Sequence, residues 1–228
     1  MPSIISIKQS ALLWIILWIS LAAANAAVTP YAHYRMGDSA PASNGGNNLP
    51  YDSSGNGWHM TNSAAGTPVI TSTGGPDNDA YYTFNGIDQH FYGTTTGWNP
   101  PEDNVGVEVW VRTPNLSQVN QHIFGTGDNT VGLNLGYDAT NGTGWFGAVA
   151  GVAFAGSIGT GNYTAGDWIH LAVVRSAGIT TFYANGIPVG TTTSVPADAS
   201  GINALHMAVN NGGTSMFSGD IAEARIFT

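Results

Sequence analysis

Residues 167–186 constrain the fold more than any other part of the chain. They read Asp-Trp-Ile-His-Leu-Ala-Val-Val-Arg, then a short polar break ending in Gly-Ile-Thr, and then Thr-Phe-Tyr-Ala-Asn-Gly. Asn185-Gly186 falls between two apolar segments, and Asn-Gly readily adopts the positive φ angles of a type I′ turn, the strongest short-range signal of a β-hairpin. The block therefore predicts a strand, a turn, a second strand and then a hairpin turn.

The rest of the chain repeats this pattern of short apolar segments and turns. Its 228 residues include 31 glycines and 11 prolines, and these residues, with Asn and Asp, interrupt the apolar segments at fairly regular intervals. Such a pattern predicts an all-β sandwich or barrel. A second pair, Asn85-Gly86, predicts another hairpin. The predicted strands cover residues 32–36, 81–84, 89–92, 105–112, 122–125, 131–137, 144–150, 152–156, 168–175, 180–184, 187–191, 204–209 and 216–227.

The first 26 residues have the pattern of a secretory signal peptide. Lys8 precedes an apolar run at residues 11–21, and the small residues Ala24-Asn25-Ala26 form a cleavage site. A retained membrane anchor is the alternative, although the run is short for a bilayer span of about 20 residues. We therefore expect a single domain at residues 27–228, secreted or held at the cell surface, with no membrane span after cleavage and no cysteine for disulfides.

The charge balance excludes one class of partner. The chain has five Lys+Arg against 14 Asp+Glu, and without Lys8 the balance is 4 − 14 = −10. A chain this acidic does not bind nucleic acid through a basic patch. Only 8% of the residues are charged, so the surface must be rich in Thr, Ser, Asn and Gly. Such a surface suits neutral polar partners such as sugars, or a solvated spacer.

Six segments, in order, resemble the laminin G-like (concanavalin A-like) jelly-roll family. The resemblance implies an all-β, two-sheet antiparallel β-sandwich that serves as an exported recognition module. The matching segments are Tyr-Arg-Met-Gly-Asp at 34–38, Asp-Ser-Ser-Gly-Asn-Gly at 52–57, Phe-Asn-Gly at 84–86 with Tyr92, Val-Glu-Val-Trp-Val at 107–111, Trp-Ile-His-Leu-Ala at 168–172 and Gly-Asp-Ile-Ala-Glu-Ala-Arg-Ile-Phe at 219–227.

The resemblance also raises the question of a structural Ca²⁺ ion. Members of this superfamily often hold calcium with a carboxylate near the last strand, where this chain has Ala222. Asp220 lies two residues away, and Asp38 and Asp52 lie in predicted loops with oxygen ligands of the kind calcium takes. We name Asp38, Asp52 and Asp220 as the metal candidates. Asp is also a common turn residue, so a purely structural role is the alternative.

Exposed aromatic rings are the candidates for stacking against sugars. Trp58, Tyr92, Trp98 and Trp145 are the predicted ligand-binding residues, because they lie in Gly- and Asn-rich surroundings or open a predicted strand. Trp110 and Trp168 lie in apolar strands, and we expect them in the core. The alternation in residues 105–112 places four valines on one face and Glu108, Trp110 and Arg112 on the other.

Related folds include glucanases, which need two carboxylates in one cleft. Glu108 stands alone on its strand, and Glu102 and Glu223 are isolated in the sequence. No nucleophile motif is present, and we interpret His170 as a structural histidine. The sequence thus predicts a non-catalytic module that binds carbohydrate or a cell-surface glycan. A structural or adhesive module that contacts other proteins is the main alternative, and a glycoside hydrolase is the third.

Overall fold

The computed structural model describes residues 28–37, 49–63, 66–93, 96–127, 130–200, 205–210 and 213–228. The predicted signal peptide and Asp38 lie outside these residues. The described part contains β-strands and two single-turn 3-10 helices, η2 (Pro76–Asn78) and η3 (Thr140–Gly142). It holds no helix with the length and apolar character that a bilayer crossing requires.

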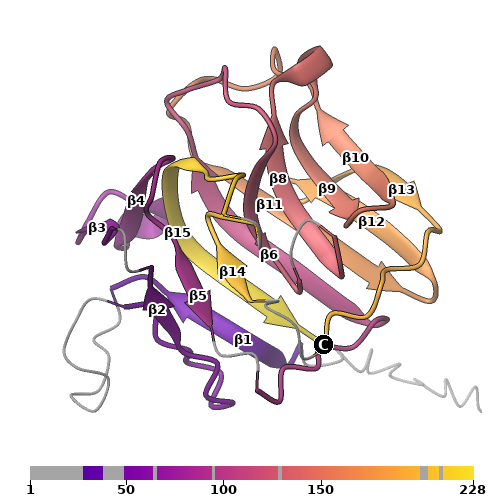
Figure 1. Cartoon of the computed structure of the whole chain (residues 1–228). Helices are drawn as coiled ribbons and strands as arrows, with labels where there is room; N and C mark the ends of the chain where they lie inside the picture. Colours follow the sequence, from indigo (N-terminus) through magenta and orange to yellow (C-terminus); the bar gives the residue numbers. More distant parts are fainter. Residues whose placement is uncertain are drawn as a thin grey trace, which may run out of the picture.

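Two antiparallel sheets form the fold, as predicted from the sequence (Figure 1). Sheet A has eight strands in the order β13-β12-β11-β6-β15-β4-β3, and β1 also pairs with β15. Sheet B has seven strands in the order β10-β9-β8-β7-β14-β5-β2. The strands are β1 (Pro30–Arg35), β2 (Met60–Asn62), β3 (Val69–Thr71), β4 (Tyr81–Asn85), β5 (Phe91–Gly93), β6 (Val105–Arg112), β7 (Gln121–Gly125), β8 (Leu133–Asp138), β9 (Gly144–Val149), β10 (Ala153–Ile158), β11 (Ile169–Ser176), β12 (Ile179–Ala184), β13 (Ile187–Thr192), β14 (His206–Met207) and β15 (Ser218–Phe227).

Each predicted strand overlaps a strand of the structure. Among the described strands, only β2 and β3 were not predicted from the sequence. Both have three residues, which is too short for an alternating pattern to be recognised. The hairpin at Asn185-Gly186 is confirmed, since both residues have positive φ, at 49° and 77°, between the paired strands β12 and β13.

The hairpin predicted at Asn85-Gly86 is wrong. β4 belongs to sheet A and β5 to sheet B, so this segment crosses between the sheets instead of pairing its two flanking strands. The Asn85 side-chain oxygen accepts hydrogen bonds from the backbone N–H groups of Ile87, Asp88 and Gln89, and it thereby shapes the crossover. Asn can organise such loops through its side chain as well as form type I′ turns.

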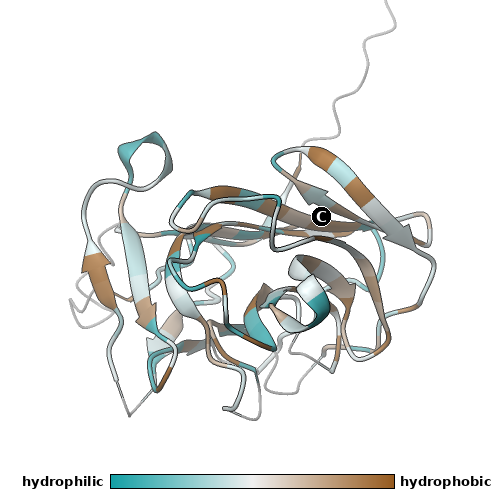
Figure 2. Ribbon diagram, turned by 90° about the horizontal axis from the view of Figure 1, so that it is seen from above, coloured by the Kyte–Doolittle hydropathy of each residue, from teal (hydrophilic) through white to brown (hydrophobic). Residues whose placement is uncertain are grey.

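The core lies between the sheets and follows the period-two pattern. Val105, Val107, Val109 and Val111 of β6 are at most 2% exposed and face sheet B, and the residues between them face outward. Figure 2 shows brown, hydrophobic segments interspersed with pale and teal ones along the ribbons. The inward-facing residues of β11 and β15 are buried in the same alternating pattern. The polar side chains of these strands therefore lie on the outer face of sheet A.

At one contact between the sheets, a residue without a side chain meets an aromatic ring. A Cβ atom at Gly147 of β9 would lie 2.5 Å from Cδ2 of Phe182, a fully buried ring on β12. We expect Gly147→Ala to lower the free energy of unfolding by roughly 1–3 kcal/mol, because the ring cannot move without straining a packed core. The urea midpoint of unfolding measures this loss.

The matched control is Gly161→Ala. Gly161 is exposed, and a Cβ atom there would meet nothing within 4 Å. Its midpoint should stay close to that of the wild-type protein. Equal midpoints for the two variants would show that Phe182 does not restrict position 147.

Candidate functional site

Charged side chains gather on the outer face of sheet A. The sequence has only four arginines and three glutamates, yet three of those arginines and two of those glutamates lie on this face, so it differs from the rest of a charge-poor surface. We call the depression there the outer-face groove and define it by the following residues. They are His33 and Arg35 of β1, Glu223 and Arg225 of β15, Glu108 and Trp110 of β6, and His170 of β11.

Strand pairing aligns these residues in rows across the sheet. Trp110 is opposite Glu223 on one side and opposite His170 on the other. Glu108 is opposite Arg225 in the next row. Residues that are directly opposite in an antiparallel pair point to the same face and lie about 4.5–5.5 Å apart at Cβ. Four strands that are distant in sequence therefore deliver their side chains to one surface.

A β-bulge in β15 makes this alignment possible. The pairing with β6 shifts between Ile221 and Glu223, which leaves Ala222 as the extra residue. Asp220, Glu223 and Arg225 consequently all face outward. In a strand without the bulge, strict alternation from an outward-facing Asp220 would place Glu223 and Arg225 on the core side. The sequence contains no clear signal for this bulge, since a bulge depends on the partner strand.

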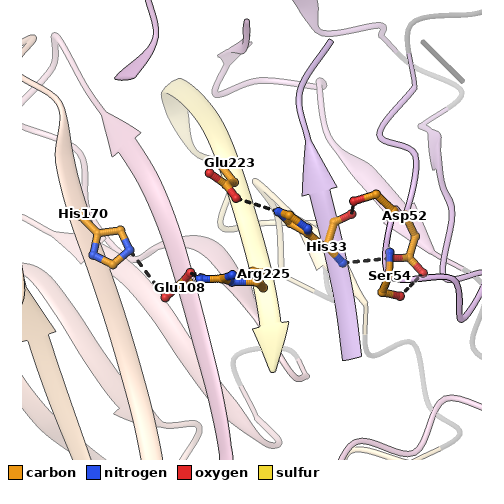
Figure 3. Close-up of polar contacts among 8 residues, drawn as sticks. His33, Asp52, Ser54, Glu108, His170, Glu223 and Arg225 are labelled. Carbon is orange, nitrogen blue, oxygen red and sulfur yellow. Dashed lines mark hydrogen bonds and ion pairs between the residues drawn. The ribbon is translucent and has the colours of Figure 1, made fainter. Parts of the chain in front are cut away.

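Two ion-paired contacts organise the groove (Figure 3). Arg225 donates to Glu108 Oε1 through Nε at 2.7 Å and also through Nη2. His33 Nε2 lies 2.7 Å from Glu223 Oε1 and donates to it. His170 Nε2 is 3.7 Å from Glu108 Oε2, which is too long for a hydrogen bond. Both glutamates are thus held in fixed positions by cationic or N–H partners.

The electrostatic surroundings shift two pKa values in the groove. Burial of the imidazole lowers the pKa of His170, and the negative charges of Glu108 and Glu223 oppose this shift. The hydrogen bond from His33 lowers the pKa of Glu223, partial burial opposes it, and the charges of Arg225 and Arg35 add to the lowering. The groove therefore favours an ionised Glu223 and an uncharged His170.

The groove consists of two adjoining hollows that share Trp110 and Glu223. One has a volume of about 220 Å³, and the η2 loop closes it with Pro76, Asp77 and Asp79. The other has a volume of about 330 Å³ and extends toward His170. Their shared wall is a half-buried indole next to a carboxylate.

A second polar contact anchors the η2 loop above the sheet. The Arg112 guanidinium lies beside two aromatic rings that contact each other, 4.9 Å from the centroid of Tyr81 and 4.6 Å from that of Trp168. Its Nε donates to Asp220 at 2.7 Å. Trp168 in turn donates through its indole N–H to the carbonyl of Gly74, at 3.1 Å. These contacts hold the loop that forms one wall of the groove.

The structure separates the four aromatic residues predicted to bind a ligand. Trp98 and Trp145 are each 1% exposed, so both are core residues and neither offers a ring face to a sugar. Trp58 is half-buried and packs edge-on against Trp98, with ring centroids 5.0 Å apart. Tyr92 is 40% exposed on sheet B. Only Trp58 and Trp98 come together, and they do so as a packing contact.

The expectation of buried Trp110 and Trp168 is also wrong. Trp110 is half-buried on the outer face and lines both hollows, and Trp168 is half-buried next to Arg112. The signal for Trp110 was present in the sequence, because it alternates with the inward-facing valines. Glu223, isolated in the sequence, is likewise brought to the same hollow as Glu108.

The calcium candidates within the described residues, Asp52 and Asp220, are each hydrogen-bonded to other protein groups. Asp52 is 1% exposed, and its carboxylate accepts hydrogen bonds from the N–H groups of His33, Ser54 and Trp58 and from the Ser54 hydroxyl. Asp220 accepts from Arg112 and Thr83. The described part of the chain has no group of three or more acidic or histidine side chains placed to hold a metal ion.

Comparison with known families agrees with the fold. Residues 85–228 match the laminin G-type family described as the concanavalin A-like lectin/glucanases superfamily. The match covers more than half of the chain, and the chain belongs to this superfamily. A comparison with curated protein sequences finds no significant match.

Solved structures with the same fold include sugar-binding and protein-binding examples. Domain 4 of AbnA, an extracellular GH43 arabinanase from Geobacillus stearothermophilus, solved with arabinotriose, has a TM-score of 0.61 and 21% identity, over 88% of this chain and 92% of that one. The Trypanosoma rangeli sialidase gives 0.57 and 14%, over 87% and 30%. The botulinum neurotoxin DC binding domain, solved with rat synaptotagmin II, gives 0.56 and 14%, over 87% and 48%. At these identities the likeness shows the fold alone.

We expect two groove residues to make stability depend on pH in separate ranges. A lowered pKa in the folded state means that the unfolded chain binds protons first, so stability falls as pH falls. The loss from His170 begins near its ordinary pKa of 6.5 and that from Glu223 near 4.5. Urea unfolding at stepped pH should show the upper loss absent in His170→Gln and the lower loss reduced in Glu223→Gln. Unchanged profiles would contradict both assignments.

We also expect Asp52 to stabilise the position of His33 in the groove. Its carboxylate holds the backbone N–H of His33, which presents the imidazole to Glu223. Asp52→Ala should lower the free energy of unfolding by at least about 2 kcal/mol, because it leaves several buried donors unpaired. The control is Asp198→Ala, at an exposed turn where the carboxylate accepts hydrogen bonds from Ser200. Similar urea midpoints for the two variants would contradict this role.

Proposed function

We propose that this protein is an exported, non-catalytic recognition module that binds carbohydrate in the outer-face groove. The observation that carries the proposal is the position of Trp110, a half-buried indole in the shared wall of two hollows lined by carboxylate, imidazole and guanidinium groups. Sugar sites combine an aromatic ring, which packs against the apolar face of the sugar, with a few fixed polar groups for the hydroxyls.

The fold and its relatives support the choice of ligand. The arabinanase domain with the same fold was solved with arabinotriose, and the match extends over nearly the full length of both chains. That domain is part of an extracellular enzyme, and residues 1–26 here have the pattern of a signal peptide. Export and carbohydrate recognition are therefore proposed together.

The state of the two groove glutamates supports a non-catalytic role. A glycoside hydrolase needs one carboxyl group kept protonated as an acid, which requires a raised pKa. Glu223 has a lowered pKa because His33 donates to it, and Glu108 accepts two hydrogen bonds from Arg225. Glu223 is thus suited to accept hydrogen bonds from hydroxyl groups and unsuited to donate a proton to a leaving group, and Glu108 is engaged by its ion pair.

The proposal is tested by a binding screen on the exported protein. The panel holds arabinotriose, neutral plant and bacterial polysaccharides and their uronic acid-containing counterparts, with calcium and again with chelator. Trp110→Ala should weaken binding to the positive ligands by roughly tenfold or more, because removing a ring that packs on a sugar costs at least about 1.4 kcal/mol. Chelation should leave binding unchanged, since Asp52 and Asp220 are paired with protein groups.

Tyr92→Ala is the matched control, because Tyr92 is an exposed aromatic residue on the other sheet. It should bind as the wild type does, and the urea midpoint of Trp110→Ala verifies that this variant is folded. Wild-type affinity in Trp110→Ala would show that the groove is not the carbohydrate-binding site. Failure of every glycan to bind would contradict carbohydrate recognition and favour the alternative of a module that contacts other proteins.

A further inference from the structure

The η2 loop brings two further carboxylates to the outer-face groove. Asp77 and Asp79 line the hollow of about 220 Å³ together with Glu223 and the indole of Trp110. Both aspartates are exposed, and neither carboxylate forms a hydrogen bond or an ion pair with another residue that the structure describes. They differ in this from Glu223, which His33 already engages. The two aspartates are therefore available to a ligand.

The balance of formal charge in this hollow is negative. Its walls carry Asp77, Asp79 and Glu223 against Arg35, which gives 1 − 3 = −2 with histidine neutral. The arginine of the adjoining hollow is paired with the glutamate there. A hollow of about 310 Å³ on the outer face of sheet B has, by contrast, no charged side chain of the described residues in its lining. A group that enters the hollow beside η2 meets an excess of carboxylate, which attracts a cation and repels an anion.

The fold fixes the backbone that carries the two aspartates. The Gly75 N–H donates to the Asp79 carbonyl at 2.9 Å, and the Asp79 N–H donates to the Pro76 carbonyl at 3.0 Å. A Cβ atom at Gly75 would lie 3.5 Å from that of Ala222, so the loop packs directly on the bulge of β15. Asp77 has a φ of 54°, a left-handed conformation that Asp and Asn adopt more readily than most residues. Groups on a fixed loop bind a ligand with a smaller loss of conformational entropy.

The aromatic wall of the hollow adds an independent attraction for a cation. Trp110 comes from β6, is half-buried and lines both hollows of the groove. His170 packs beside its ring, with centroids 5.1 Å apart, and the rest of the indole borders the hollows. A positive group within about 6 Å of a ring centroid is attracted to the ring face, and Trp is the most effective of the aromatic side chains.

We propose that the outer-face groove recognises an amino sugar whose nitrogen carries a positive charge. Such a sugar has a C–H face that would pack on Trp110, an ammonium group that would lie near Asp77 and Asp79, and hydroxyl groups that would donate to Glu223. A uronic acid would bring a like charge to these carboxylates, and an N-acetylated sugar would leave the aspartates unused. The inference rests on the carbohydrate recognition proposed above and names the class of sugar.

The charge of the whole molecule acts in the same direction. The chain has a formal charge of −9 at pH 7, with only five Lys+Arg. A field of this sign attracts a polymer in which each sugar unit carries a positive charge, and it repels a polyanionic glycan. Because exposed charges are screened by ions, binding of this kind weakens as salt is added.

The test compares sugars that differ in whether the nitrogen is charged. Isothermal titration calorimetry of the exported protein at neutral pH gives the dissociation constants of the β-1,4-linked trimers of glucosamine and of N-acetylglucosamine. The methyl glycosides of galactosamine and N-acetylgalactosamine are titrated in the same way. At least one charged sugar should bind about tenfold more tightly than its acetylated counterpart. This difference should shrink as salt is added.

Two double variants separate the effect of charge from that of the acetyl group. Replacing Asp77 and Asp79 together by Asn removes two charges and nearly preserves both shapes, and Asn also tolerates the left-handed conformation. This variant should lose most of the preference for the charged sugar and keep its affinity for the acetylated one. The control replaces Asp138 and Asp198, which lie outside both hollows, by Asn. It removes the same charge and should keep the preference, and equal preferences in the two variants would overturn the role of the η2 loop.

The remaining outcomes distinguish this inference from the proposed function. Binding of acetylated or neutral glycans that depends on Trp110, without a preference for the charged sugars, would overturn the inference and leave the proposed function standing. Failure of every glycan to bind would overturn both. Trilysine, which carries ammonium groups without sugar rings, is titrated in parallel. Binding of trilysine as tight as that of the amino sugars would overturn the sugar in favour of a cationic peptide.

Discussion

The pairing of β6 with β15 is the contact on which the rest of the structure depends. On the inner face, Val107 and Val109 pack with Ile226 and Ala224 in the core. On the outer face, the same strand pair carries Glu108 and its Arg225 partner. A one-residue slip would exchange the two faces and bury ionised groups without water. The register is therefore fixed from both sides, and β1, β4 and β11 add to a pair whose orientation is already determined.

That register also explains why a groove exists at this place. The bulge at Ala222 turns Glu223 outward, so that a second carboxylate joins Glu108 on the same surface. The ion pairs then hold these side chains in single positions, and a fixed polar group binds a ligand without first losing conformational freedom. Arg112, packed beside Tyr81 and Trp168, helps to hold the loop that closes one hollow.

The two outer faces of the sandwich differ in charge and in the way their polar groups are satisfied. Sheet A presents ionised groups that pair with one another, and sheet B presents an uncharged hollow with one unpaired amide oxygen. The difference in charge reflects how few arginines and glutamates the chain has, since most of them lie on the outer face of sheet A. The two outer faces of one sandwich therefore present different chemistry to solvent.

The sequence by itself determined the fold class, nearly all the strands and the inward row of valines, because alternation and the Asn185-Gly186 turn are properties of neighbouring residues. It also placed Trp110 opposite those valines, although we expected that ring in the core. Only the tertiary structure decided which rings are covered. Trp98 is buried next to Trp58 and Tyr31, and Trp145 next to Phe217, each covered by segments distant in sequence. Pairing between distant strands likewise brought Glu223 to Glu108 and placed Asn85-Gly86 in a crossover. Burial and ion pairing depend on what lies across a sheet or between two sheets, and local sequence does not encode it.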